Sequence, residues 1–337
     1  MPTSMTRALP FISVVVPAHN RPTQLGALLS AIAEQSYPTA AFEVLVCDDG
    51  SNPALAELIP FRHAAFSLRF LRRPQAGPAA ARNRGLNESR GTIVAFTDDD
   101  CLPDPAWLES IAEAFADPNT FAVHGPVRSS CPPIEFFVHS LSLGPEQGVA
   151  TANFAARKEC LLALDGFDAT FEAPYFEDED LARRLEERYG EIAWSDGMVV
   201  EHPPRKIGWS QAWRAATYWH WLPYFRRRHP EAWSGALPGV YRRIVLKTTL
   251  LLLGAAPVLG APGVFFFSWA VLFAWQARRL KSLLSLAMQH GWRIDFPPQM
   301  AFLALEWLLD YRRAWSAWQG RDVQMKPQGD IETELGF

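Results

Sequence analysis

Cysteine is scarce in this sequence, and its cysteines are far apart. Four occur among 337 residues, at Cys47, Cys101, Cys131 and Cys160, and no two of them form a C-x-x-C pair. Structural zinc sites and disulfide frameworks depend on closely spaced or paired cysteines. The spacing therefore argues against both and fits a reducing, cytosolic environment.

Two common phosphate-binding signatures are also missing. No G-x-G-x-x-G follows the first apolar run, and no G-x-x-x-x-G-K-[ST] occurs anywhere, so the usual dinucleotide and P-loop interpretations fail. We expect no secretory signal, because Met1–Pro10 is polar and Phe11–Pro17 is too short for the apolar core of one. We find no internal repeat.

The hydrophobic content of 49% is sufficient for a core, but charge is divided unevenly along the chain. Residues 1–201 carry 15 basic and 28 acidic side chains, a balance of −13, whereas residues 202–337 carry 17 and 8, a balance of +9. This uneven charge predicts that the chain has two regions with different surroundings or partners, and that the boundary between them lies near Glu201.

Short apolar runs alternate with amphipathic stretches in the first part. The strand-like runs are 11–16, 42–47, 67–71 and 92–97, and the helix-like stretches are 25–32, 54–59, 78–89 and 106–115. We expect Pro17 to end the first strand. This alternation predicts an α/β fold with a mostly parallel sheet flanked by helices.

Polar side chains follow three of these runs. The run 92–97 leads directly into Asp98, Asp99 and Asp100, and the earlier runs lead into His19-Asn20 and Asp48-Asp49. Open α/β sheets bind ligands at the carboxyl ends of their strands, and adjacent carboxylates are tolerated best beside a divalent cation or bound partner. With Arg82 and Arg84 nearby, a nucleotide held through a metal ion would use all these groups. A solvated acidic turn is the alternative.

Six motifs in order carry a resemblance to a known family. They are VVVPAHNRP, CDDGS, GPAAARNRG, FTDDDCLP, TANFAARKECLLALDGFD and YFEDEDLARRL, within residues 11–205. The chain resembles the family 2 glycosyltransferases, which have the GT-A fold and a nucleotide-sugar donor. The resemblance implies a donor site and a divalent cation, Mg²⁺ or Mn²⁺.

Residue roles follow from that resemblance. The implied nucleotide-sugar residues are Pro17, His19, Asn20, Arg21, Asp48, Arg82, Asp98 and Asp99, although Asp99 could serve only as a supporting carboxylate. The implied metal residues are Asp98, Asp100 and His202. A lone histidine after a strand is usually structural, but imidazole is also a reasonable ligand for manganese.

The acidic run Glu177–Asp180 opens a predicted helix. Acidic residues at a helix start are stabilising in any case, because they complement the helix dipole. Direct displacement at a sugar carbon, however, needs a general base to take the proton of the incoming hydroxyl. Asp178 matches the family's base, with Glu177 or Asp180 as alternatives, and the resemblance implies inversion at the anomeric carbon.

The second part has membrane-like features. Residues 208–228 are basic and rich in aromatics, as expected of a helix at a membrane surface, and packing on the catalytic domain is the alternative. Residues 248–275 contain no charge, have basic flanks, and are interrupted by glycine and proline. We expect a re-entrant hairpin there, or one tilted span.

These observations predict three regions: a catalytic domain over residues 1–205, a helical membrane-associated region over 206–324 (with a further surface helix at 300–309), and a disordered tail over 325–337. The sequence predicts that the protein is an inverting, metal-dependent glycosyltransferase at the cytoplasmic face of the cell membrane, with no nucleic-acid partner. Its acceptor would be a lipid-linked glycan of cell-envelope polysaccharide synthesis, with Lys206, Arg226, Arg227 and Arg228 near a diphosphate. The alternatives are a metal-dependent nucleotidyltransferase and a catalytically silent membrane scaffold.

Overall fold

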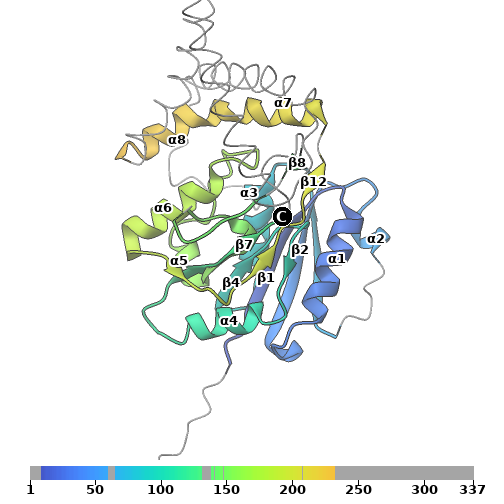
Figure 1. The fold of residues 1–337 in the computed structure, drawn as a ribbon, viewed down its shortest axis with the longest axis vertical. Coiled ribbons are helices and arrows are strands. Elements are labelled where there is room, and N and C mark those ends of the chain that lie inside the picture. The colour runs from blue at the N-terminus through green and yellow to red at the C-terminus, as the bar shows by residue number, and fades with distance from the viewer. Residues whose placement is uncertain are drawn as a thin grey trace, which may run out of the picture. The chain divides into compact units, whose positions relative to one another are not determined.

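The computed structural model describes residues 9–59, 65–130, 138–139, 141–146, 148–206 and 208–231 (Figure 1). The chain divides into two units. The first comprises Met1–Cys131 and Val138–Lys206, and the second comprises Pro132–Phe137 and Ile207–Phe337.

A seven-stranded sheet forms the centre of the first unit, in the order β10-β6-β9-β4-β1-β2-β3. Its strands are β1 (Ile12–Ala18), β2 (Phe42–Asp49), β3 (Ser67–Arg73), β4 (Ile93–Phe96), β6 (Ala122–His124), β9 (Phe154–Arg157) and β10 (Ala193–Trp194). All neighbouring pairs are parallel except those that β9 makes with β4 and β6. The prediction of a mostly parallel α/β sheet is therefore confirmed.

Two small sheets accompany the central one. The first contains β5 (Leu102–Pro103), β11 (Val200–Glu201) and β7 (Val127–Arg128), and the second pairs β12 (Arg205–Lys206) with β8 (Val138–His139). Strand β5 begins directly after Cys101, and β11 ends directly before His202. The antiparallel pairing of β11 with β5 thereby brings His202 to the triple aspartate, across a long sequence separation.

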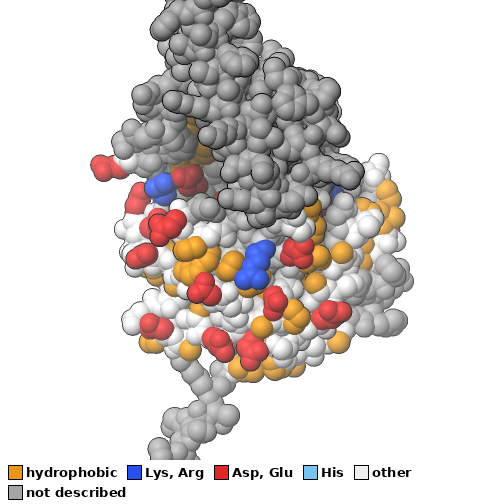
Figure 2. All heavy atoms as spheres, viewed as in Figure 1, with side chains coloured by type: hydrophobic (Ala, Val, Ile, Leu, Met, Phe, Trp, Pro, Cys, Tyr) orange, Lys and Arg blue, Asp and Glu red, His pale blue; other side chains and the backbone are white. Residues whose placement is uncertain are grey.

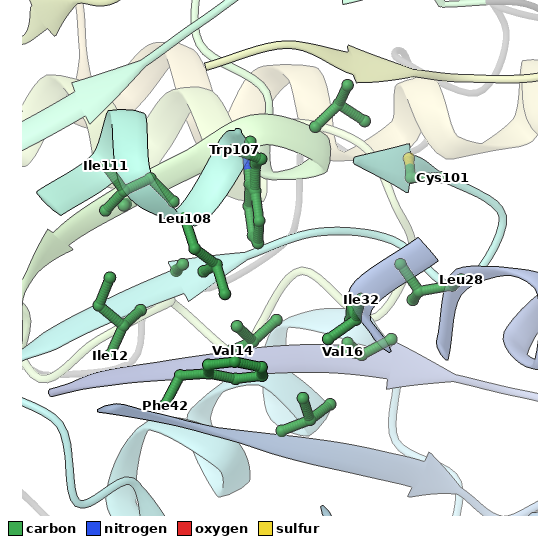
Figure 3. Packing of buried hydrophobic residues seen from close by; sticks show 14 of the residues in the cluster. Ile12, Val14, Val16, Leu28, Ile32, Phe42, Cys101, Trp107, Leu108 and Ile111 are labelled. Carbon is green, nitrogen blue, oxygen red and sulfur yellow. The ribbon is translucent and has the colours of Figure 1, made fainter. Parts of the chain in front are cut away.

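Helices cover both faces of the central sheet. They are α1 (Pro22–Ala33), α2 (Leu55–Leu58), α3 (Pro78–Glu88), α4 (Trp107–Ala114), α5 (Lys158–Leu162) and α6 (Glu177–Tyr189), with 3₁₀ turns η1 (Thr39–Ala41) and η2 (Thr151–Asn153). Because strand side chains alternate, Val14 packs on one face with α1 and α4, whereas Val15 packs on the other with α3, α5 and α6. Figure 3 shows the first of these cores, around Trp107.

Helix α3 lies unusually close to the sheet. A Cβ on Gly85 would come within 2.4 Å of Val15 Cγ1 and 2.8 Å of Cys47 Sγ, so any larger residue would push the helix outward. Since Arg82 lies one turn earlier on this helix, glycine at position 85 sets how deeply that arginine is buried.

Pro17 lies inside β1, in register with Cys47, so the prediction that it ends the first strand is wrong. Proline lacks the N–H that a central strand normally donates. It is tolerated here because the pairing of β1 with β4 already stops at Val15 and Phe96.

The described part of the second unit is a broken helix. It consists of α7 (Trp209–Thr217), a 3₁₀ turn η3 (Tyr218–Trp221) and α8 (Leu222–Arg228), rather than the single helix expected over 208–228. Pro223 in the first turn of α8 explains the break, since proline is tolerated at a helix start but not in its interior.

None of the described helices has the length and apolar character needed to cross a membrane. The segments 248–275, 300–309 and 325–337 lie outside the described residues.

Candidate active site

The ends of β1 and β2 are tied together by their loops. His19 Nδ1 donates to the backbone carbonyl of Asp49 over 2.8 Å, and the backbone N–H of Asn20 donates to Ser51 Oγ over 2.9 Å. The side-chain oxygen of Asn20 in turn accepts from the N–H of Asn52, and Asn20 adopts a positive φ of 54°. The predicted nucleotide residues His19 and Asn20 therefore form one edge of the site.

Asp48 and Asp49 hold the loops that surround this edge. The buried carboxylate of Asp48 accepts the backbone N–H groups of Ser51 and Leu55, at 2.8 and 3.0 Å. Asp49 accepts those of Ala76 and Gly77, at 3.0 and 2.8 Å, and so fixes the start of α3. Both of these hydrogen bonds of the Asp48 side chain are made within residues 48–55.

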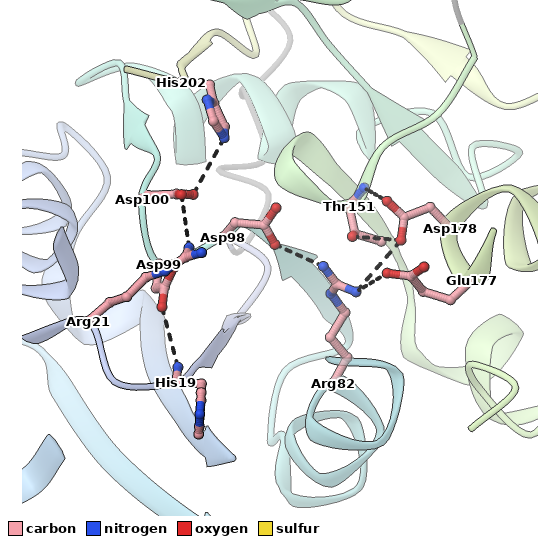
Figure 4. Close-up of polar contacts among 10 residues, drawn as sticks. All are labelled: His19, Arg21, Arg82, Asp98, Asp99, Asp100, Thr151, Glu177, Asp178 and His202. Atoms are coloured by element: carbon pink, nitrogen blue, oxygen red, sulfur yellow. Dashed lines mark hydrogen bonds and ion pairs between the residues drawn. The ribbon is translucent and has the colours of Figure 1, made fainter. Parts of the chain in front are cut away.

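Arg21 joins two members of the triple aspartate. Its Nη1 lies 2.9 Å from Asp99 Oδ1 and 2.9 Å from Asp100 Oδ2 (Figure 4). Asp99 is buried and also accepts the backbone N–H of His19 at 3.4 Å. Burial raises the pKa of Asp99 to about 7, against the opposing charge of Arg21. Asp99 thus links the turn after β4 to the loop after β1, through the His19 N–H and Arg21.

Arg82 joins the third member to a different group of carboxylates. Its Nη2 lies 2.8 Å from Asp98 Oδ1, while Nη1 lies 3.0 Å from Glu177 Oε1 and 3.6 Å from Asp178 Oδ1 (Figure 4). Burial would lower the pKa of this arginine, but the charges of Asp178, Asp98 and Glu177 outweigh it and raise the pKa. One buried guanidinium thereby connects the end of β4 to the start of α6.

The acidic run at the start of α6 divides into distinct environments. Asp178, whose side chain is 25% exposed, accepts the backbone N–H and the hydroxyl of Thr151 at 2.9 and 3.0 Å. Glu177 is buried, and burial, followed by the charge of Asp178, raises its pKa well above the usual range. Asp180 is buried and accepts from Arg184 Nε at 2.8 Å.

Asp100 and His202 can hold a divalent metal ion. His202 Nε2 lies 3.5 Å from Asp100 Oδ1, and donor atoms of Asp100, Cys101 and His202 all lie within 4.8 Å of one another. A carboxylate with an imidazole suits Mn²⁺, and a carboxylate also suits Mg²⁺. Burial raises the pKa of the Cys101 thiol well above its usual range, and the side chain packs in the core, so the carboxylate and the imidazole are the suitable ligands.

The remaining predicted residues lie on other elements. Lys206 ends β12, and Arg226, Arg227 and Arg228 end α8 in the second unit, where Arg228 donates to the Tyr224 hydroxyl at 3.1 Å. Arg84 pairs with Glu88 on its own helix at 3.2 Å. Acidic side chains are widespread on the described surface in Figure 2, in keeping with the charge balance of residues 1–201.

Two residues of the site carried no role in our sequence interpretation. Thr151 lies within the motif TANFAAR, but nothing in its residue type pointed to Asp178. Arg205 follows His202 closely, and its Nε lies 4.0 Å from Asp100 Oδ2. The basic residues after His202 were the available signal for Arg205.

Comparison with known proteins gives a consistent result. Residues 13–155 match the family model described as Glycosyl transferase family 2. The chain is similar to Glycosyltransferase AglE of Haloferax volcanii, with 38% identity over 130 residues, which is 38% of this chain and 43% of that protein. It is also similar to Pre-mycofactocin glycosyltransferase of Mycobacterium tuberculosis, with 30% identity over 238 residues, 65% of this chain and 48% of that protein. The chain thus matches less than half the length of each of these relatives.

Solved structures share the fold. The mannosyltransferase PcManGT from Pyrobaculum calidifontis, in complex with GDP-Man and Mn²⁺, superposes with a TM-score of 0.57 at 19% identity, over 93% of this chain and 88% of that one. S. aureus TarS in complex with UDP gives a TM-score of 0.51 at 17% identity, over 92% and 88%. The expected GT-A-type α/β fold is thereby confirmed.

Proposed function

We propose, from the premise that residues 13–155 belong to glycosyl transferase family 2, that this protein moves a sugar from a nucleotide-sugar donor to an acceptor hydroxyl with inversion. One observation carries the proposal. Arg82 contacts Asp98 at the nucleotide edge and Asp178 at the start of α6, at 2.8 and 3.6 Å. A donor-binding carboxylate and a candidate base therefore lie around one buried charge.

Asp178 is the general base in this proposal. The acceptor oxygen forms a bond to the anomeric carbon while the bond from that carbon to the diphosphate oxygen breaks, and the hydroxyl proton passes to the Asp178 carboxylate. A single displacement of this kind inverts the anomeric centre. Thr151 holds both oxygens of Asp178 in place, at 2.9 and 3.0 Å.

The two alternative bases suit other roles. Glu177 is buried and pairs with Arg82 Nη1 at 3.0 Å, so its carboxylate is not accessible to an acceptor hydroxyl. Asp180 faces Arg184, which also donates to the backbone carbonyls of Leu164 and Gly166 at 2.8 Å each. These contacts support a role for Asp180 in fixing α6 to its neighbouring loop.

The donor would lie along the edge formed by Pro17, His19, Asn20 and Asp98, with Asp100 and His202 holding Mn²⁺ or Mg²⁺. The bound ion would supply positive charge to the departing diphosphate. The PcManGT structure contains GDP-Man with Mn²⁺ and the TarS structure contains UDP, which supports a nucleotide donor but leaves two bases to compare.

We place the reaction at the cytoplasmic face of the cell membrane, with a lipid-linked glycan acceptor. The support is the basic, aromatic segment 208–228 and the uncharged segment 248–275 with its basic flanks. Arg226 and Arg227 are exposed at the end of α8, as residues that meet a diphosphate or lipid phosphates must be. Tags at residues 1 and 337 that both stay inaccessible from outside intact cells would support a re-entrant hairpin, and an exposed residue 337 would contradict it.

The test of the proposed activity is a panel of UDP-, GDP- and dTDP-sugars incubated with the full chain, with Mn²⁺ or with a chelator. We expect Mn²⁺-dependent release of nucleoside diphosphate from at least one donor. Pyrophosphate release from nucleoside triphosphates and a sugar phosphate would instead identify a nucleotidyltransferase. Tight donor binding without turnover, in the presence of lipid-linked acceptors, would favour the silent scaffold.

A further inference from the structure

Two arginines and a histidine lie around the Asp100 carboxylate. Arg21 Nη1 lies 2.9 Å from its Oδ2, Arg205 Nε lies 4.0 Å from the same oxygen, and His202 approaches Oδ1. The arginines come from different places, the loop after β1 and strand β12. Asp100 is thus held by residues that are far apart in the sequence.

Arg205 is incompletely paired in this arrangement. Its Nε is buried, yet this atom has no hydrogen-bond partner among the described residues. Burial lowers the pKa of Arg205, and the charge of Arg21 lowers it further, while Asp100 and Asp99 oppose the change. Arginine nonetheless stays protonated in proteins, so the site keeps a cation that is poorly matched with anions.

A divalent ion on Asp100 would worsen this mismatch. A bound ion would offset the charge of Asp100, so that two guanidinium groups would then lie beside two further positive charges. Such an arrangement requires an anion that can pair with guanidinium groups. A diphosphate meets the requirement, because its oxygens accept the paired N–H donors of arginine.

We propose that Arg21 and Arg205 are exchangeable counter-ions, which neutralise Asp99 and Asp100 in the ligand-free site and transfer to the donor diphosphate when a metal ion takes Asp100. This inference rests on the proposed function and adds Arg205 to the donor-binding residues. It implies that metal and nucleotide bind cooperatively, because each alone leaves charge unbalanced and together they balance it.

The contrast with Arg82 supports this assignment. Arg82 is 4% exposed and contacts three carboxylates, whereas Arg21 and Arg205 are 33% and 32% exposed and contact the last two aspartates of the triplet. Partly exposed side chains can change partners without opening the core.

Calorimetry on the full chain tests the exchange. We would titrate Mn²⁺ alone, UDP, GDP and dTDP alone, and each nucleotide with saturating Mn²⁺, into wild type, Arg205→Gln, Arg205→Lys and Arg183→Gln. Arg183 is the matched control, since its side chain is also 32% exposed and pairs with Glu179 on α6 at 2.7 Å. Uridine and guanosine show whether an effect requires the diphosphate.

We expect Arg205→Gln to bind Mn²⁺ alone about threefold to tenfold more tightly, and to reduce the cooperativity between Mn²⁺ and nucleotide about tenfold, which is about 1.4 kcal/mol. Arg205→Lys keeps the charge and should fall between wild type and Arg205→Gln in both quantities. This second variant also serves if Arg205→Gln does not fold.

Cooperativity within twofold of wild type in the Arg205 variants would overturn the proposal. If none of the three nucleotides binds wild type, the proposed function fails. The titration with Mn²⁺ alone then still measures whether Arg205 competes for Asp100, and an unchanged affinity there overturns the exchange as well.

Discussion

Two arginines organise the two sides of this site in opposite ways. Arg82 is buried in the middle of Asp98, Glu177 and Asp178, and Gly85 on the same helix allows its close approach to the sheet. Arg21 lies at the end of a loop, partly exposed, and bridges Asp99 and Asp100. The same residue type is thus buried on the proposed acceptor side, around Asp178, and partly exposed on the proposed donor side, around Asp100.

The difference matches what each side must do. A general base, the role we propose for Asp178, must keep one geometry, and the contacts of Arg82 and Thr151 restrict Asp178 accordingly. A donor site must take up and release a highly charged ligand, which requires counter-charges that can change partners. Substitutions on the Arg82 side should therefore affect turnover and stability, whereas those on the Arg21 side should affect ligand binding.

The largest effect is expected for Asp178→Asn. Loss of the general base should reduce turnover about 10²–10⁴-fold, with nucleotide affinity retained, because the amide cannot accept the acceptor proton. Steady-state rates with a saturating donor measure this. The control is Glu179→Gln, one residue along the helix, where Glu179 pairs with Arg183 at the surface. Equal turnover in Asp178→Asn and the control would contradict the assignment.

Arg82→Met should destabilise the fold by about 3–5 kcal/mol, because it removes the buried cation that pairs with the buried Glu177 and with the partly exposed Asp98 and Asp178. Urea unfolding monitored by tryptophan fluorescence gives the free energy of unfolding. Arg183→Met breaks an exposed ion pair and should cost only about 0–1 kcal/mol. A loss as small for Arg82 as for Arg183 would show that Arg82 does not fix the acceptor side.

Thr151→Val should reduce turnover about tenfold. The substitution removes the hydroxyl that donates to Asp178 Oδ1 and keeps the backbone N–H that donates to Oδ2. A hydrogen bond to a charged group contributes about 1.5–3 kcal/mol, of which we expect part to appear in the activation barrier. Thr92→Val, at an exposed position, is the control. Unchanged turnover would show that the backbone contact alone orients the base.

The last prediction is a pH dependence of stability assigned to Glu177. Because its pKa in the folded chain lies above the ordinary value of 4.5, the folded state holds a proton that the unfolded state releases. Stability should therefore decrease as pH rises above 4.5 towards the raised pKa, by at most about 1.4 kcal/mol per unit. Glu177→Gln removes this titration, so urea unfolding between pH 5 and 8 should show a flatter profile for the variant. Parallel profiles would contradict a raised pKa.

Sequence patterns located the main strands well but not the contacts between distant side chains. The apolar runs 42–47 and 92–97 closely match β2 and β4, since periodicity and composition are local signals. Strand β9 escaped prediction because its sequence FAAR contains no β-branched residue, and its antiparallel place between β4 and β6 depends on tertiary packing.

The candidate site shows the same limit. The motifs identified Asp98, Asp100 and Asp178 as candidate site residues. Thr151, in contrast, contacts Asp178 partly through its backbone N–H, and a sequence does not reveal such a contact. For Asp180 a local signal did exist, because Arg184 follows at the i, i+4 spacing of a helical ion pair. Arg205 reaches Asp100 from a two-residue strand whose pairing is set by the fold.

The most direct measurement compares Asp100→Asn with Asp178→Asn for Mn²⁺-dependent nucleotide binding and for sugar transfer, using the donor that the nucleotide-sugar panel identifies. The account predicts that Asp100→Asn loses the Mn²⁺-dependent part of nucleotide binding, whereas Asp178→Asn binds as wild type does and loses transfer. If both variants transferred sugar at the wild-type rate, or if Asp178→Asn lost binding and Asp100→Asn kept it, the division into a donor side and an acceptor side would be wrong.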